Sequence, residues 1–171
     1  MLYPPKSSRI HPSSRISHSM PNTLPVPLLP QQNDGDCLPT CVEMITAYWD
    51  KHIARQDLIE LFDTDPAVGT PAGRVLRLQT MGWAVVLQPA SENDFRQWLA
   101  QQIPVILLVD TGELPYWARR CAHAVVLVSI AQDTTIVNDP AFAAAPISVS
   151  LGDLLLASDA MDHLALAITP G

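Results

Sequence analysis

The sequence has few charged residues, and their balance is acidic. Only 16% of the 171 residues are Asp, Glu, Lys or Arg, and 17 acidic against 10 basic side chains give a formal net charge of -7. An acidic surface repels phosphate backbones, so we expect no nucleic acid partner. The basic residues Lys6, Arg9 and Arg15 lie in the first twenty residues, where no acidic residue occurs. The rest of the chain is therefore more acidic still.

Cysteines and long apolar runs are also scarce. Three cysteines are an odd number, which argues against a disulfide framework and favours reduced thiols. No apolar run approaches the roughly 18 residues of a membrane-spanning helix. The longest, Pro104 to Val109 and Ala122 to Ile130, have the length of strands. Prolines interrupt Leu24 to Leu29, which makes a poor signal-peptide core. We predict a cytoplasmic protein without a membrane span.

The chain divides into a short tail and a longer apolar part. Ser, Pro, Arg and His dominate residues 1–23, which offer almost nothing for a core to bury. We predict a disordered tail over 1–23 and one globular domain over 24–171, whose apolar content suffices for a core. Met20 as the true first residue stays open.

Hydrophobic periodicity predicts helices first and strands later. A helix opens at Cys37, because Val42 and Ile45 recur at helical spacing after it. We expect further helices over 55–62, 72–81, 91–100 and 150–157, and strands over 83–87, 104–109, 122–130, 134–137 and 163–168. This order predicts an α+β protein with two segregated layers and an all-helical first lobe.

Cys37 stands where a catalytic thiol is expected. A thiol attacks carbonyl carbon as the thiolate, and the first turn of a helix favours the anion through its free N–H groups and its dipole. The Cys37 N–H can donate to a developing oxyanion, and an amide side chain arriving from just upstream can provide a second donor. Gln31 and Gln32 are both candidates, and the choice between them depends on their spacing from Cys37.

A base and an orienting carboxylate occur later in the chain. His123 begins a strand, and Asp139 ends the strand that returns after a turn near residue 132. Paired strands can therefore bring the two side chains together. An imidazole held by a carboxylate is the partner that a catalytic cysteine requires.

These residues resemble a known family. The run from Gln31 to Cys41, QQNDGDCLPTC, is similar to the nucleophile motif of the double-glycine leader peptidases. These are papain-like cysteine peptidase domains fused to bacteriocin-exporting ABC transporters, together with free-standing relatives. In that family a Gln six residues before the nucleophile and a later His, followed by Asp-Pro, complete the site. Gln31, His123 and Asp139-Pro140 match this order.

The resemblance implies a two-lobed papain-like α+β fold, with N-terminal helices packed on a mainly antiparallel sheet. It implies peptide-bond hydrolysis after a pair of small residues, with Cys37, His123, Asp139 and Gln31 as catalytic residues. The substrate is a peptide or protein, we expect no cofactor or metal, and a separate transporter is a candidate partner. The sequence departs from the family at Leu38, where a Gly is usual. We expect Leu38 to shape the cleft, beside Tyr116 and Trp117 as substrate contacts.

Two other functions remain open from the sequence. Cys37, Cys41, Cys121 and His123 make a candidate zinc set, since i,i+4 on a helix and i,i+2 on a strand bring ligands together. A structural zinc domain would use this set. A catalytically degenerate module that only binds peptides is the second alternative.

Overall fold

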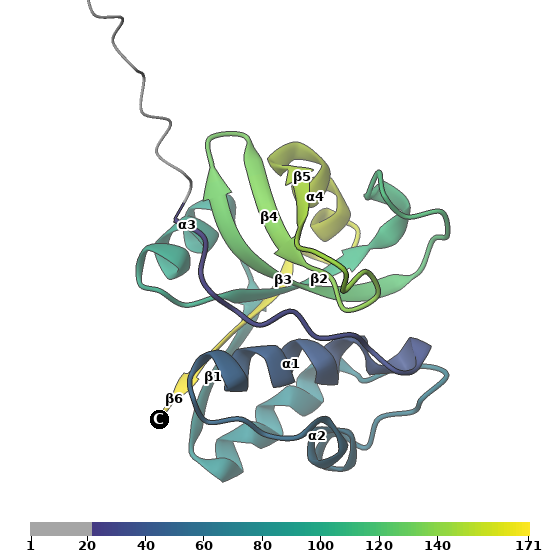
Figure 1. Cartoon of the computed structure of the whole chain (residues 1–171), viewed down its shortest axis with the longest axis vertical. Helices are drawn as coiled ribbons and strands as arrows, with labels where there is room; N and C mark the ends of the chain where they lie inside the picture. Colours follow the sequence, from purple (N-terminus) through teal and green to yellow (C-terminus); the bar gives the residue numbers. More distant parts are fainter. Residues whose placement is uncertain (1–21) are drawn as a thin grey trace, which may run out of the picture.

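The described part of the molecule, residues 22–171 of a computed structural model, is an antiparallel sheet with helices on both faces (Figure 1). The tail predicted over 1–23, Met20 included, lies outside these residues apart from its last two positions. The elements in chain order are η1 (Asp34–Asp36), α1 (Cys37–Tyr48), α2 (Arg55–Phe62), η2 (Ala72–Met81), β1 (Trp83–Pro89), α3 (Glu92–Ala100), β2 (Val105–Asp110), η3 (Thr111–Glu113), β3 (Ala122–Ala131), β4 (Thr134–Asn138), β5 (Ile147–Ser150), α4 (Leu151–Asp159) and β6 (Leu164–Pro170).

The sheet has six strands in the order β1-β6-β2-β3-β4-β5, and every neighbouring pair is antiparallel. The predicted hairpin of β3 and β4 is present, with Val126 opposite Asn138 and a register shift between Leu127 and Ser129. His123 is the second residue of β3 and Asp139 directly follows β4, so both lie at the same end of the hairpin. The predicted α+β fold class is confirmed.

Helices cover both faces of the sheet, because its central strands are apolar on both sides. In β3, Ala124, Val126 and Val128 join the core that includes α1, α2 and η2. Val125 and Leu127 point the other way, into the core that includes α3 and α4. A strand that is buried on both faces needs a layer on each. The expected segregation into two layers with an all-helical first lobe is therefore wrong, and β1 belongs to the common sheet.

The segment before the first helix runs along the sheet. Two hydrogen bonds of 3.0 Å hold it there: the Leu24 N–H donates to the Val128 carbonyl oxygen, and the Asn138 side-chain Nδ2 donates to the Val26 carbonyl oxygen. Leu24 and Val26 are buried. This segment leads directly to Gln31, so its contacts set where that residue enters the cleft.

The helix predicted over 72–81 has the tighter 3₁₀ geometry. Arg74 and Arg77 reach back from it to carbonyl groups at the end of α2, with Arg77 Nη1 2.8 Å from the Leu61 oxygen. These bonds satisfy carbonyls that a helix end leaves free. Gly82 ends the segment with a φ of 83°, as its position in the sequence predicted. β5 carried no signal that we identified in the sequence.

Candidate active site

Cys37 is the first residue of α1 and is half-buried. The turn η1 precedes it and is closed by Asp36, whose Oδ2 accepts hydrogen bonds from the Asn33 N–H at 3.0 Å and from Asn33 Nδ2 at 2.8 Å. The Asp36 carbonyl in turn accepts a hydrogen bond from the Thr40 hydroxyl at 2.7 Å. These bonds fix the backbone on both sides of the Cys37 thiol.

Gly35 allows a second loop to pack against this turn. A Cβ at position 35 would lie 2.2 Å from the Asp65 carbonyl oxygen, and the Gly35 N–H donates to the Pro66 carbonyl oxygen at 2.9 Å. Within that loop the Asp65 carboxylate accepts hydrogen bonds from two backbone N–H groups, including that of Val68 at 3.1 Å. The loop thereby holds Val68, whose side chain is 85% exposed, at the edge of the cleft.

His123 and Asp139 form a buried pair. His123 Nε2 lies 2.8 Å from Asp139 Oδ1, and both side chains are almost inaccessible to solvent. His123 and Cys37 line the same cavity, and their interaction raises the pKa of His123. Because Nε2 faces the carboxylate, Nδ1 is the ring nitrogen left for the thiol. The structure therefore brings Cys37, His123 and Asp139 together at one site.

The Asp139 carboxylate receives four hydrogen bonds in all. Oδ1 accepts from His123 and from the Ala141 N–H at 2.9 Å, while Oδ2 accepts from the Tyr116 hydroxyl at 2.8 Å and from Trp117 Nε1 at 3.0 Å. A buried charge needs such partners to offset its lost hydration. The same four bonds leave the carboxylate a single orientation.

The net effect of burial, hydrogen bonds and charge is to raise the pKa of His123 and to lower that of Asp139. Burial alone would lower the pKa of His123, but the hydrogen bonds and charges of Asp139 and Cys37 outweigh it and raise that pKa to about 9. Burial favours a higher pKa for Asp139, yet the His123 bond and charge and two further hydrogen bonds lower it. The pair is therefore imidazolium and carboxylate at neutral pH.

Three aromatic rings cover the pair. Trp117 packs edge-on against His123 with ring centroids 4.9 Å apart, and Phe142 contacts both Trp117 and Tyr116, at 5.1 and 5.3 Å. Tyr116 and Trp117 were predicted as substrate contacts, and the structure directs their polar atoms to Asp139. Burial followed by the Asp139 charge raises the pKa of Tyr116, which keeps its hydroxyl a donor. The bonds from Tyr116 and Trp117 to Asp139 were not foreseen from the sequence.

Gln31 faces the same cleft, whereas Gln32 is exposed. The Gln31 N–H donates to the Pro140 carbonyl oxygen at 2.9 Å, and its side-chain Nε2 donates to the Asn33 carbonyl oxygen at 3.0 Å. An amide nitrogen carries two N–H groups, so one remains for another acceptor.

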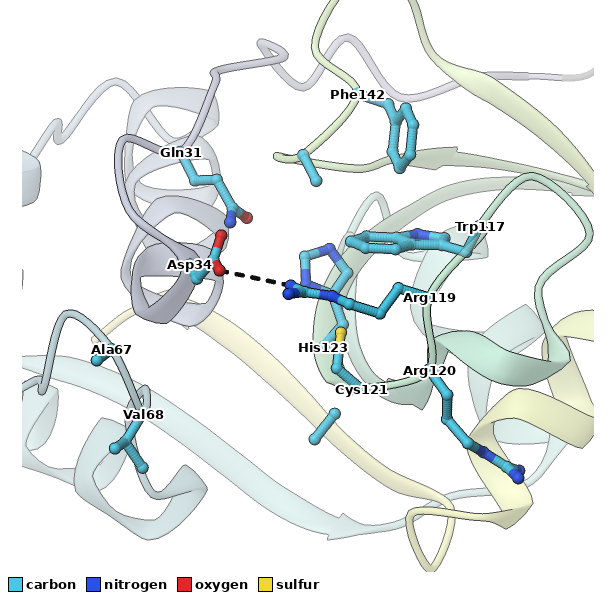
Figure 2. Close-up of a pocket in the computed structure, with 12 residues that line it drawn as sticks. Gln31, Asp34, Ala67, Val68, Trp117, Arg119, Arg120, Cys121, His123 and Phe142 are labelled. Carbon is cyan, nitrogen blue, oxygen red and sulfur yellow. Dashed lines mark hydrogen bonds and ion pairs between the residues drawn. The ribbon is translucent and has the colours of Figure 1, made fainter.

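Two cavities adjoin His123. The larger one, of about 530 Å³, is lined by Gln31, Asp34, Ala67, Val68, Trp117, Arg119, Arg120, Cys121, Ala122, His123, Ala141 and Phe142 (Figure 2). The smaller one, of about 330 Å³, is lined by Cys37, Leu38, Val68, Gly69, Thr70, Pro71, Ala72, Leu108, Ala122, His123, Ala124 and Met161. Leu38 is 2% exposed and packs into the core beside the smaller cavity, so it forms part of the wall without filling the opening.

The alternative zinc set is not assembled. Within residues 22–171, no group of three or more His, Cys, Asp or Glu side chains is placed to hold a metal ion. Cys41 is fully buried, its thiol donates to the Ala124 carbonyl oxygen at 3.4 Å, and burial raises its pKa. Cys121 lies on the larger cavity, and its backbone N–H donates to the Thr111 hydroxyl oxygen at 2.8 Å. The three thiols thus have separate surroundings.

The chain is a cysteine peptidase of papain-like fold. A sequence model of the Peptidase C39 family matches residues 26–155, so the chain belongs to that family. A comparison with curated proteins found no match.

Solved structures agree on the fold. A C39-like peptidase from Bacillus anthracis is 14% identical, with a TM-score of 0.74 over 89% of this chain and 98% of that one. The peptidase domain of Streptococcus ComA, a bi-functional ABC transporter, is 20% identical, with a TM-score of 0.67 over 85% and 99%. A double glycine motif protease from an AMS/PCAT transporter, solved with its leader peptide, is 17% identical, with a TM-score of 0.69 over 95% and 100%. The predicted papain-like fold is confirmed.

Between residues 22 and 171, no helix is both long and apolar enough to span a bilayer.

Proposed function

We propose that this peptidase removes leader segments from peptide substrates, with Cys37 as nucleophile, His123 as acid and base, Asp139 as the residue that orients His123, and Gln31 as an oxyanion donor. The observation that carries the proposal is the series from Asp139 through His123 to Cys37: a 2.8 Å hydrogen bond joins the first two residues, and the last two line the same cavity. This series joins the start of α1 to the hairpin of β3 and β4, and it borders both cavities.

In the first half of the reaction, the Cys37 thiolate attacks the carbonyl carbon of the scissile peptide bond and a C–S bond forms. The charge that develops on the carbonyl oxygen is stabilised by the Cys37 N–H and the free amide N–H of Gln31. His123 then gives its proton to the amide nitrogen as the C–N bond breaks. The amine product leaves, and the acyl part remains on Sγ as a thioester.

In the second half, neutral His123 takes a proton from water, and the hydroxide equivalent attacks the thioester carbonyl. The C–S bond breaks, the acid product leaves, and the thiolate and imidazolium are restored. Asp139 keeps the ring oriented with Nδ1 toward sulfur throughout. Tyr116 and Trp117 keep Asp139 in place through their bonds to Oδ2.

The smaller cavity supports a substrate with uncharged residues before the scissile bond. Its wall contains Gly69, Ala72, Ala122 and Ala124, and His123 is its only titratable group apart from Cys37. Such a wall suits an uncharged segment better than a charged side chain. The structural relatives include a double glycine motif protease in complex with a leader peptide, and this similarity supports the same substrate class here. A separate transporter is a candidate partner under this proposal.

The experiment uses synthetic peptides of about twelve residues with a central Gly-Gly pair, and it detects products by mass spectrometry. Wild type should cleave after the pair, Cys37→Ala should be inactive while retaining the wild-type circular dichroism spectrum, and Gln32→Ala should keep full activity. A matched peptide with Leu-Leu at the centre should resist cleavage. Binding of the Gly-Gly peptide without cleavage by the wild type would instead identify a degenerate peptide-binding module and refute the proposal.

A further inference from the structure

The two cavities can bind different parts of one peptide substrate. In the proposed reaction the acyl part stays bonded to Cys37 Sγ until water releases it, while the amine part takes its proton from His123 and leaves. Cys37 lines the smaller cavity and not the larger one, whereas His123 lines both. The acyl part therefore belongs in the smaller cavity, and the residues after the scissile bond belong in the larger one.

The larger cavity differs from the smaller one in carrying charged side chains. Asp34, Arg119 and Arg120 line it, whereas no Asp, Glu, Lys or Arg among residues 22–171 lines the smaller cavity. Arg120 is already paired, with Asp110 at 2.8 Å and Glu113 at 2.9 Å, and it points away from the cavity in Figure 2. Arg119 extends across the opening toward Asp34. Arg119 is thus the cation that faces a peptide entering this cavity.

The contact between Arg119 and Asp34 is weak. Its one N–O distance is 3.4 Å, and the two side chains are 67% and 74% exposed. Exposed pairs of this kind add little to stability. The Arg119 backbone, in contrast, is anchored, because its carbonyl accepts a 2.7 Å hydrogen bond from the Thr111 hydroxyl. The guanidinium can therefore exchange Asp34 for another partner while the backbone of Arg119 stays fixed.

Binding near Arg119 favours a substrate with an acidic side chain over one with a basic side chain. A carboxylate can take two parallel hydrogen bonds from the guanidinium in place of the single long contact, and exposed Asp34 returns to water at little cost. A lysine on the substrate would make only a point contact with Asp34 and would leave Arg119 without a partner.

We propose that the larger cavity binds the residues that follow the scissile bond, and that Arg119 selects an acidic side chain at the first or second of these positions. The proposal rests on the peptidase function and adds a subsite on the leaving-group side. Asp34 acts as the competitor that a substrate carboxylate displaces, so Asp34→Asn strengthens the selection.

The test compares peptides that share one Gly-Gly sequence and end in an amide, so that no terminal carboxylate competes. They differ only in Glu, Ala or Lys at either of the two positions after the pair. Wild type, Arg119→Glu and Lys51→Glu are assayed for kcat/KM. Lys51→Glu makes the same charge change at an exposed site just past the end of α1. Binding of the same peptides to Cys37→Ala, with and without Arg119→Glu, is measured in parallel.

The expected preference of wild type for Glu over Lys is about threefold to fivefold, as for an exposed ion pair, and it weakens as salt is added. Arg119→Glu should reverse the preference, and Lys51→Glu should preserve it. Cleavage of the Ala peptide with equal rates for Glu and Lys overturns the subsite and leaves the peptidase function standing. Charge-selective binding to Cys37→Ala without wild-type cleavage overturns the function and retains the subsite. Absence of both cleavage and binding overturns both.

Discussion

The backbone N–H of Gln31 donates a 2.9 Å hydrogen bond to the carbonyl oxygen of Pro140. Gln31 leads into the turn before Cys37, and Pro140 directly follows Asp139. This bond therefore ties the chain that leads to the nucleophile to the loop that carries the orienting carboxylate. The two halves of the proposed site are held in register by backbone, independently of any side chain that takes part in the chemistry.

The role of Gln31 can be separated from that of its neighbour. Gln31→Ala removes the proposed oxyanion donor and should lower kcat by about 10²-fold to 10³-fold, with little change in KM. Gln32→Ala changes an identical but exposed side chain and should leave kcat unchanged. Equal losses in the two variants, measured on the Gly-Gly peptide, would contradict the assignment.

The raised pKa of His123 sets a pH limit on activity. The imidazolium has to be present to pair with the thiolate and to protonate the leaving amine, so kcat/KM should fall as the pH rises through about 9. Asp139→Asn removes a carboxylate that raises this pKa, and the alkaline limit should therefore move to lower pH, together with a loss of rate. An alkaline limit that stays in place in Asp139→Asn would show that another group controls it.

Gly35 should be intolerant of a side chain. Gly35→Ala puts a Cβ 2.2 Å from the Asp65 carbonyl oxygen, so the turn before Cys37 and the loop at residues 65–69 have to separate. We expect a loss of about 2 kcal/mol or more in the free energy of unfolding, and a larger proportional loss of activity. Gly73→Ala is the control, since its Cβ meets nothing within 4 Å. Urea unfolding that gives equal stabilities for both variants would disprove the tight contact.

Tyr116 should contribute to stability through Asp139. Tyr116→Phe deletes a donor to a buried carboxylate and should cost about 1–3 kcal/mol in unfolding free energy. Tyr48→Phe deletes a hydroxyl that donates to the Gln102 carbonyl in an exposed bond, and it should cost less than about 0.5 kcal/mol. Thermal and urea unfolding measure both variants. Similar losses of unfolding free energy would show that the bond to Asp139 stabilises the fold no more than the exposed bond of Tyr48.

The parts of the fold that depend on local pattern could be predicted from the sequence. The helix that begins at Cys37, the helix over 55–62 and the hairpin of β3 and β4 follow from hydrophobic period and turn residues, and the structure confirms them. The layering could not be predicted in this way, because which face of the sheet a helix covers depends on contacts between distant segments. The helices α3 and α4 thus lie on the face opposite α1.

Part of the candidate site could likewise be predicted from the sequence, and part could not. Cys37, His123 and Asp139 were named from motif order, and the structure brings them together, while their catalytic roles stay predictions. The bonds from Tyr116 and Trp117 to Asp139 link residues 22 or more positions apart through a loop with no regular period. No spacing in the sequence indicates such a contact. The presence of two donor side chains shortly before His123 was the only available signal, and it favoured a substrate-binding role equally well.

The account depends most on the coupling of Cys37 to His123, and thiol labelling tests it directly. The reduced protein is treated with limiting iodoacetamide at pH 6, and mass spectrometry follows each cysteine in wild type and in His123→Ala. Cys41, which is buried, and Cys121 serve as internal references. The account predicts that Cys37 is labelled first in the wild type and loses this advantage in His123→Ala. Slow and equal labelling of all three thiols, or fast labelling of Cys37 that persists without His123, would contradict it.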